Sequence, residues 1–177
     1  MTTATIGPVA TSTDNADLIP ALMDELADLE GRPVEWASQR WPNLTALPAT
    51  DEWWESAAAE QLREELAERL DELAPLFCRF EERDTIRGTM YGFFPDMERI
   101  QEGEDIAHLT DSGHHGAGLE LDGEPAPDGE WVPMAEYRLF VLGIEKYRHV
   151  AYVNDHGNLD VYEWHQPEEY RLLFSAV

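Results

Sequence analysis

Apolar residues recur every three or four positions in the first part of the chain, which is the period of an amphipathic helix. A first helix is predicted from Asp14 or Asn15 to Glu30, where Gly31 supplies the stop. Acidic residues occupy its other side and are expected to face water. The apolar face consists of Leu18, Leu22, Leu26 and Leu29.

A second amphipathic helix is predicted between Thr50, which suits an N-cap, and Pro75, which ends the run. Its apolar stripe consists of Trp54, Ala58, Leu62, Leu66, Leu70 and Leu73. The opposite side carries nine acids against two bases, Arg63 and Arg69. These acids are Asp51, Glu52, Glu55, Glu60, Glu64, Glu65, Glu68, Asp71 and Glu72.

After residue 76 the pattern changes to the alternation of β-strands. The clearest alternation runs from Tyr147 to Trp164 and predicts an antiparallel hairpin with its turn at residues 154–157. The further elements expected are a strand pair at 76–83 and 88–94, a short helix at 95–103 and a strand at 137–144. Residues 168–177 are expected to form a strand, or a short helix followed by a strand. The predicted fold is α+β, with N-terminal amphipathic helices packed on a mostly antiparallel β-sheet and a C-terminal hairpin.

The domain organisation follows from length and from composition along the chain. Residues 1–13 are small and polar and are expected to form a flexible tail. Residues 14–177 are expected to form a single domain, since one hydrophobic core is common at this length. Residues 100–136 hold no Lys or Arg, many acids and frequent Gly and Pro, which predicts a long acidic loop with little regular structure.

Charge is the outstanding compositional feature. The chain holds 37 acids and 12 bases, only one of which is a lysine, Lys146, and its net charge is −25. This charge argues against direct binding to nucleic acid or to an anionic membrane, which both require cationic side chains. Cys78 is alone, so no internal disulfide forms, and no signal peptide or apolar run long enough to span a bilayer is present. We therefore expect a cytoplasmic protein.

Catalytic motifs are absent from the sequence. There is no G-x-S-x-G nucleophile motif and no phosphate-binding glycine loop, and Cys78 lies in an apolar strand segment typical of an inert thiol. A candidate metal site comprises His108, Asp111, His114 and His115, whose spacing matches no metallohydrolase signature. We expect no cofactor and no enzymatic activity, and keep a metal-dependent enzyme using these four residues as an alternative.

The acidic residues of the second helix and of the loop suggest mimicry of nucleic acid. Duplex DNA carries one negative charge per roughly 1.7 Å of axis, and carboxylates arranged on a folded protein present a similar field to a basic cleft. The expected partner is a basic nucleic-acid-binding protein or defence complex. The residues expected to bind it are Glu60, Glu64, Glu65, Glu68, Asp71, Glu72, Glu120, Asp122, Glu124, Asp128 and Glu130.

The negative charge is compatible with several further roles. An acidic surface is also typical of a solvated helix face, of adaptation to high salt, of a general acidic interaction module, or of an immunity protein against a basic toxin. The sequence does not distinguish a monomer from a homodimer.

Two segments carry a resemblance to a known group of proteins. Tyr91, Gly92, Phe94, Pro95 and Asp96 form a Y-G-x-F-P-D segment, and residues 153–158 form a V-N-D-H-G-N segment. With these segments the chain resembles small uncharacterised bacterial proteins of phages, plasmids and integrative elements, over about a third of its length. The resemblance transfers no catalytic residue. It implies a mobile-element setting, in which acidic inhibitors of restriction or CRISPR complexes are common.

Overall fold

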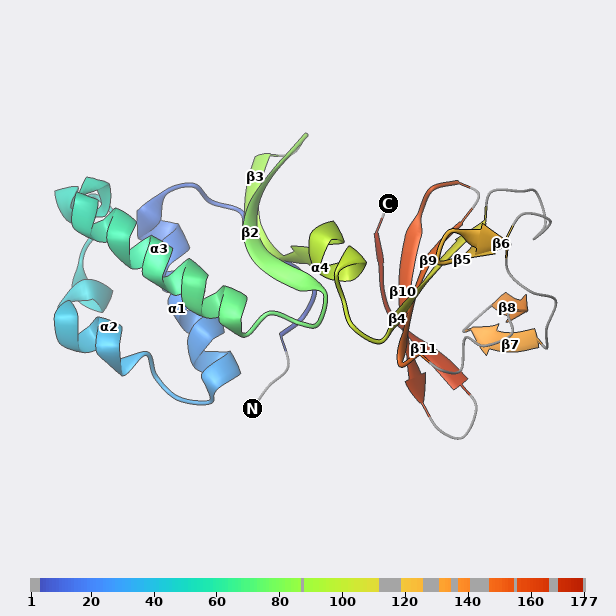
Figure 1. Cartoon of the computed structure of the whole chain (residues 1–177). Helices are drawn as coiled ribbons and strands as arrows, with labels where there is room; N and C mark the ends of the chain where they lie inside the picture. Colours follow the sequence, from blue (N-terminus) through green and yellow to red (C-terminus); the bar gives the residue numbers. More distant parts are fainter. Residues whose placement is uncertain are drawn as a thin grey trace. The chain divides into compact units, whose positions relative to one another are not determined.

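The structure, a computed structural model, describes residues 4–86, 88–111, 119–125, 131–134, 137–140, 147–154, 156–165 and 169–176. The chain groups into two compact units, Met1–Asp96 and Met97–Val177, where the sequence predicts one domain over residues 14–177. The predicted α+β class is confirmed, with the helices concentrated toward the N-terminus and the strands toward the C-terminus (Figure 1).

The N-terminal unit combines helices with a small sheet. Its elements are β1 (Gly7–Ala10), α1 (Asn15–Glu30), α2 (Glu35–Arg40), the 3-10 helices η1 (Leu44–Ala46) and η2 (Glu52–Glu55), α3 (Ala57–Glu72), β2 (Cys78–Thr85) and β3 (Gly88–Pro95).

The first helix forms as predicted. The Asp14 side chain caps it by accepting a hydrogen bond from the Ala16 backbone N–H, and Gly31 ends it with a φ of 68°. The apolar face is buried, with Leu18, Leu22 and Leu26 fully inaccessible to solvent. Burial of this face against the rest of the unit holds α1 in place.

The second predicted helix begins later than the sequence suggests. Ser56, not Thr50, is the N-cap of α3, and its hydroxyl accepts a hydrogen bond from the Ala59 backbone N–H. The residues before it form the separate 3-10 helix η2, which Asp51 caps by accepting from the Trp53 backbone N–H. Ser is a better N-cap than Thr, and Ser56 lies inside the predicted helix, so the α-helix starts there and Trp54 of the predicted stripe falls in η2.

Helices α1 and α3 run parallel and lie side by side (Figure 1). Near their first turns, Asn15 Nδ2 donates to the Trp54 carbonyl oxygen over 2.8 Å. At their last turns, Arg69 Nε lies 2.9 Å from Glu30 Oε1. Parallel neighbours need a long return connection, and this connection contains α2 and η1.

The sheet of the N-terminal unit has the strand order β1-β3-β2 and is antiparallel throughout its described residues. The predicted pairing of β2 with β3 is confirmed. Residues 7–10, within the predicted flexible tail, form the edge strand β1. Phe80, Tyr91 and Phe93 of this sheet join the buried leucines of α1 and α3 in one core.

The C-terminal unit is mainly β. Its described elements are α4 (Met97–Gln101), β4 (Ile106–Asp111), β5 (Leu119–Leu121), β6 (Glu124–Pro125), β7 (Trp131–Met134), β8 (Tyr137–Phe140), β9 (His149–Val153), β10 (Leu159–His165) and β11 (Glu169–Ala176). These strands form a mixed sheet in the order β6-β5-β4-β9-β10-β11-β7-β8, in which β4 with β9 and β11 with β7 are the parallel pairs.

The segment predicted as a long acidic loop, residues 100–136, therefore contains the strands β4 to β7 among its described residues. A two-residue turn, Asp122-Gly123, connects β5 to β6, with φ angles of 51° and 80°. These angles are those of a type I′ turn, which an Asp-Gly pair favours. The Asp-Gly pair was therefore the feature of the sequence from which this hairpin could have been predicted.

The predicted C-terminal hairpin is confirmed as β9 and β10. Asn154 Oδ1 accepts hydrogen bonds from the backbone N–H groups of His156 and Asn158, and Gly157 has a φ of 81°. Val150 and Val161 are fully buried at the centre of this pair. No helix among the described residues is long and apolar enough to cross a membrane.

Candidate partner-binding surface

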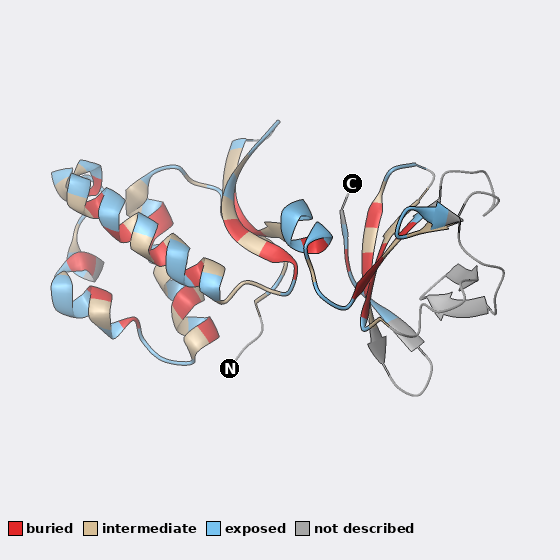
Figure 2. Ribbon diagram, viewed as in Figure 1, coloured by how far each residue is buried: buried red, intermediate tan, exposed pale blue. Residues whose placement is uncertain are grey.

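The structure places four of the six acidic residues of α3 at exposed positions on its solvent side. Leu62, Leu66 and Leu70 are fully buried on the inner side of the helix. Buried and exposed positions alternate along α3 in Figure 2. The exposed acids follow each other at four-residue intervals and form what we call the glutamate row: Glu60, Glu64, Glu68 and Glu72.

Successive members of the glutamate row are separated by about 6 Å along the helix axis, since an α-helix rises about 1.5 Å per residue. Like charges at this spacing repel and destabilise a helix by about 0.2–0.5 kcal/mol per pair. Among the described residues, Glu60, Glu64 and Glu68 make no hydrogen bond or ion pair. Among the described residues, no cation therefore neutralises the repulsion between these three glutamates by direct contact, whereas Glu72 at the end of the row is paired with Arg69.

The other three acids of α3 that were predicted to bind the partner, Glu65, Asp71 and Glu72, form contacts within the chain. Glu65 is bound by Arg40, whose Nη1 lies 2.9 Å from Glu65 Oε1, and by Gln61. Asp71 accepts a hydrogen bond over 2.8 Å from the backbone N–H of Phe80 in β2. Asp71 therefore ties the end of α3 to the sheet, a structural role that its position in an acidic run did not reveal.

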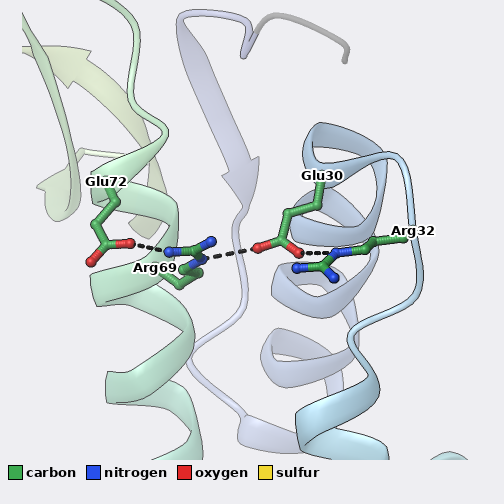
Figure 3. A network of polar contacts seen from close by, with 4 residues as sticks. All are labelled: Glu30, Arg32, Arg69 and Glu72. Atoms are coloured by element: carbon green, nitrogen blue, oxygen red, sulfur yellow. Dashed lines mark hydrogen bonds and ion pairs between the residues drawn. The ribbon is translucent and has the colours of Figure 1, made fainter.

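Glu72 belongs to a polar network at the C-terminal ends of α1 and α3 (Figure 3). Arg69 lies between Glu72 and Glu30, and Arg32 binds Glu30 from the other side over 3.0 Å. Hydrogen bonds from Arg69 and Arg32 lower the pKa of Glu30 against the opposing effect of burial. The network holds the C-terminal ends of α1 and α3 together. It therefore fixes the position of Glu72, the last residue of the glutamate row.

The acids predicted in the loop fall into two groups. Glu120 lies in β5, Asp122 in the turn and Glu124 in β6, whereas Asp128 and Glu130 lie outside the described residues. Asp122 accepts hydrogen bonds from the His108 backbone N–H and from the Tyr147 hydroxyl, both over 2.9 Å. The hydrogen bond to Asp122 raises the pKa of Tyr147. Asp122 therefore stabilises the sheet, and these residues belong to a different compact unit from α3.

The candidate metal ligands are only partly described. His108 and Asp111 lie in β4, and His114 and His115 lie outside the described residues. The described residues contain no group of three or more His, Cys, Asp or Glu side chains arranged to hold a metal ion. Cys78 is fully buried, as an inert packed thiol would be.

The residues that carry the resemblance have structural roles here. A Cβ atom on Gly92 would lie 2.2 Å from the carbonyl oxygen of Gly7, so only glycine lets β1 approach β3 this closely. Tyr91 donates a hydrogen bond to Glu82, and burial together with this contact raises the pKa of Tyr91 to about 12. Arg79 forms an ion pair with the buried Asp96 over 2.6 Å.

A tryptophan cluster beside α3 was not identified as a functional feature from the sequence. The rings of Trp41 and Trp53 meet edge to face with 6.2 Å between their centroids, and Trp53 meets Trp54 in the same manner at 5.1 Å. The Arg40 guanidinium lies 4.6 Å above the Trp41 ring while it also binds Glu65. The concentration of tryptophan between residues 36 and 54 was the feature of the sequence from which this cluster could have been predicted.

Comparison of the chain with protein-family models, with curated proteins and with solved structures finds no match. What can be proposed about function therefore depends on the surface itself.

Proposed function

We propose that the chain is a non-enzymatic inhibitor that occupies the nucleic-acid site of a host defence complex, such as a restriction or CRISPR nuclease. One observation carries the proposal. Glu60, Glu64 and Glu68 are exposed on a well-anchored helix, and no cation of the described chain pairs with them. A row of carboxylates that repel one another gains stability when a basic partner supplies the missing positive charges.

The charge density of the row bears on how closely it copies nucleic acid. Along the duplex axis, one strand of DNA carries a phosphate at intervals of roughly 3.4 Å. Along the helix axis of α3, the row carries a carboxylate at intervals of about 6 Å. The row therefore supplies about one charge for every two phosphates of a strand. A partner whose Lys and Arg side chains line a groove would find a sparser but rigid set of acceptors.

The charge of the whole chain adds a long-range contribution. A net charge of −25 attracts a basic cleft over distances beyond direct contact and raises the association rate. Salt screens this attraction, with a Debye length of about 8 Å at physiological ionic strength. Binding to the partner should therefore weaken strongly as salt is added.

The proposal is tested by competition with DNA. The immobilised chain is exposed to a bacterial lysate, and bound proteins are eluted with duplex DNA and identified. Each captured protein is then purified, and its DNA binding is measured with and without the chain in a mobility-shift assay. We expect the chain to displace DNA and the variant Glu60→Lys/Glu64→Lys/Glu68→Lys to fail to do so.

A matched control carries Asp24→Lys, Glu102→Lys and Glu104→Lys at exposed positions outside the row. Each exchange adds two charge units, so both triple variants have a net charge of −19. The control should retain inhibition. Equal inhibition by both variants would exclude the glutamate row as the interface. Capture of a basic toxin that is not a DNA-binding protein would instead favour an immunity protein with the same surface.

A further inference from the structure

We propose that Asp122 is a site of spontaneous isoaspartate formation and that the Tyr147 hydroxyl slows this modification in the folded protein. Asp122 is followed by Gly123 in the exposed two-residue turn between β5 and β6. The inference is independent of the proposed function, because it concerns covalent chemistry within the C-terminal unit.

The reaction needs only these two residues and water. The backbone nitrogen of Gly123 attacks Cγ of the protonated Asp122 side chain, and a C–N bond forms. The proton of that nitrogen and the hydroxyl group of the carboxyl leave together as water, which gives a five-membered succinimide ring. Water then adds to one of the two ring carbonyls and opens the ring, either back to aspartate or to isoaspartate. In isoaspartate the main chain continues through Cγ, and the mass of the chain is unchanged.

The turn has the features that favour this reaction. Asp122 and Gly123 are both exposed, so water reaches them, and Gly123 has no side chain to shield its nitrogen. Asp122 also has a φ of 51°, in the left-handed region where a residue other than glycine is strained. Isoaspartate formation rebuilds the backbone at this position and releases that strain.

Three hydrogen bonds oppose the reaction by holding Asp122 in place. Oδ1 of its carboxylate accepts from the His108 backbone N–H, and Oδ2 accepts from the Tyr147 hydroxyl, both over 2.9 Å. The backbone N–H of Asp122 donates to the His108 carbonyl oxygen over 2.8 Å. Because both carboxylate oxygens are bound, the side chain must give up contacts before it can turn Cγ toward the Gly123 nitrogen.

The contact with Tyr147 is the one that a substitution can remove. The two contacts with His108 use its backbone, so no exchange of the His108 side chain would break them. Tyr147→Phe deletes the hydroxyl that binds Oδ2 and keeps the aromatic ring. The loss of one hydrogen bond to a carboxylate corresponds to about a fivefold change in an equilibrium or a rate.

Isoaspartate would separate the turn from β4. The main chain gains a methylene group and the free carboxylate takes a new position, so the arrangement that joins Asp122 to His108 and Tyr147 is lost. The hairpin that this turn closes has only two pairs of partners, Glu120 with Pro125 and Leu121 with Glu124. We therefore expect faster hydrogen exchange at the Asp122 backbone N–H in the modified protein.

The test follows isoaspartate in the full chain during incubation at neutral pH. All proteins carry Asp128→Glu, which removes the other Asp-Gly pair of the C-terminal unit, residues 128–129. Isoaspartate is counted by methyl transfer from S-adenosylmethionine with a protein-isoaspartate methyltransferase, and its position is found by electron-transfer fragmentation. We expect isoaspartate at residue 122 to form about fivefold faster in Tyr147→Phe than in the chain with Tyr147.

Two controls separate protection by the fold from other effects. Tyr162→Phe removes a hydroxyl that donates to Asp160 over 3.5 Å in the same unit, and it should leave the rate at Asp122 unchanged. In urea that unfolds the chain, the proteins with Tyr147 and with Phe at this position should form isoaspartate at equal rates. Both rates should exceed the rate of the folded chain with Tyr147.

The outcomes decide the proposal. Faster formation in folded Tyr147→Phe, together with equal rates in urea, supports it. Equal rates in the two folded proteins, or no isoaspartate at residue 122 in either, would overturn it, as would an equal acceleration by Tyr162→Phe. If Tyr147→Phe does not fold, the chain with Tyr147 still decides, since an equal rate in buffer and in urea excludes protection by the fold.

Discussion

Arg69 in the last turn of α3 donates a hydrogen bond from Nε to Glu30 Oε1 at the end of α1, over 2.9 Å. The two helices are parallel, so the negative ends of their dipoles meet at this point, together with the carboxylates of Glu30 and Glu72. Arg69 is the cation that lies between them. We predict that Arg69→Gln lowers the free energy of unfolding by about 1–2 kcal/mol, measured by urea denaturation.

The control for this prediction is Arg32→Gln. Arg32 also binds Glu30, but its side chain is 70% exposed against 43% for Arg69, so its loss should cost less than about 1 kcal/mol. The pKa of Glu30 is lowered in the folded state. Its stabilising effect is therefore present above its unfolded pKa and lost as the pH falls through the folded pKa. The difference between wild type and Arg69→Gln should shrink in acid, and a constant difference would contradict this account.

Reversing one charge of the glutamate row should stabilise the protein. Glu64 stands four residues from both Glu60 and Glu68, so Glu64→Lys changes two repulsive pairs into attractive ones. We expect the free energy of unfolding to rise by about 1 kcal/mol, with a higher Tm, while inhibition of the partner weakens. A variant that is more stable but less active cannot owe its loss of activity to unfolding. A fall in stability would show that Glu64 has a structural role.

The helical part of the N-terminal unit was predictable because it depends on local periodicity and caps. Leu22 and Leu66 are buried where the pattern places them, and Asp14 and Gly31 delimit α1 as predicted. The parallel arrangement of α1 and α3 was not predictable, since it depends on contacts between residues 39 positions apart, such as Arg69 with Glu30.

The sites show the same limit. Sequence position alone assigned Asp71 and Asp122 to a partner surface, yet both accept hydrogen bonds from backbone N–H groups elsewhere in the chain. An acidic residue that faces solvent and one that accepts a hydrogen bond from a strand backbone look the same in the sequence, because the residue type and the neighbouring residues are alike. Only the tertiary structure, which brings the Phe80 and His108 backbone N–H groups to these carboxylates, separates the two roles.

The close approach of β1 to β3 makes a prediction at Gly92. An alanine Cβ at this position would meet the Gly7 carbonyl oxygen at 2.2 Å, so the backbone of β1 would have to move. We expect Gly92→Ala to destabilise the protein by about 1–3 kcal/mol and to increase hydrogen exchange in residues 7–10. Gly88→Ala offers a contrast, since its strain comes from a φ of 118° and no atom lies within 4 Å of its Cβ position. Unchanged exchange in residues 7–10 of Gly92→Ala would contradict the close packing.

His149 predicts a pH dependence in the C-terminal unit. Burial lowers the pKa of this histidine, although Glu163, 3.8 Å away, and Asp105 act in the opposite direction and Arg148 acts with burial. The unfolded state therefore binds the proton more tightly, and the stabilising effect present above about pH 6.5 is lost as the pH falls. Urea denaturation of the wild type should show lower stability at pH 5.5 than at pH 7.5. His149→Leu should show a smaller decrease, and a decrease equal to that of the wild type would contradict this account.

Arg40 provides the sharpest test of how guanidinium groups bind this surface, because it occupies one tryptophan–glutamate pair in the free protein. Arg40→Gln leaves Trp41 and Glu65 in place and removes only the occupant. We predict that the synthetic peptide octa-arginine, titrated by calorimetry, then binds about fivefold more tightly than it binds the wild type, because Trp41 and Glu65 become available to the peptide. Arg63→Gln changes the net charge equally without uncovering a tryptophan, so it should raise the binding of octa-arginine and octa-lysine by the same small factor. If the two variants raise octa-arginine binding equally, charge alone explains the effect. A gain confined to Arg40→Gln and to octa-arginine means that the indole face selects the guanidinium.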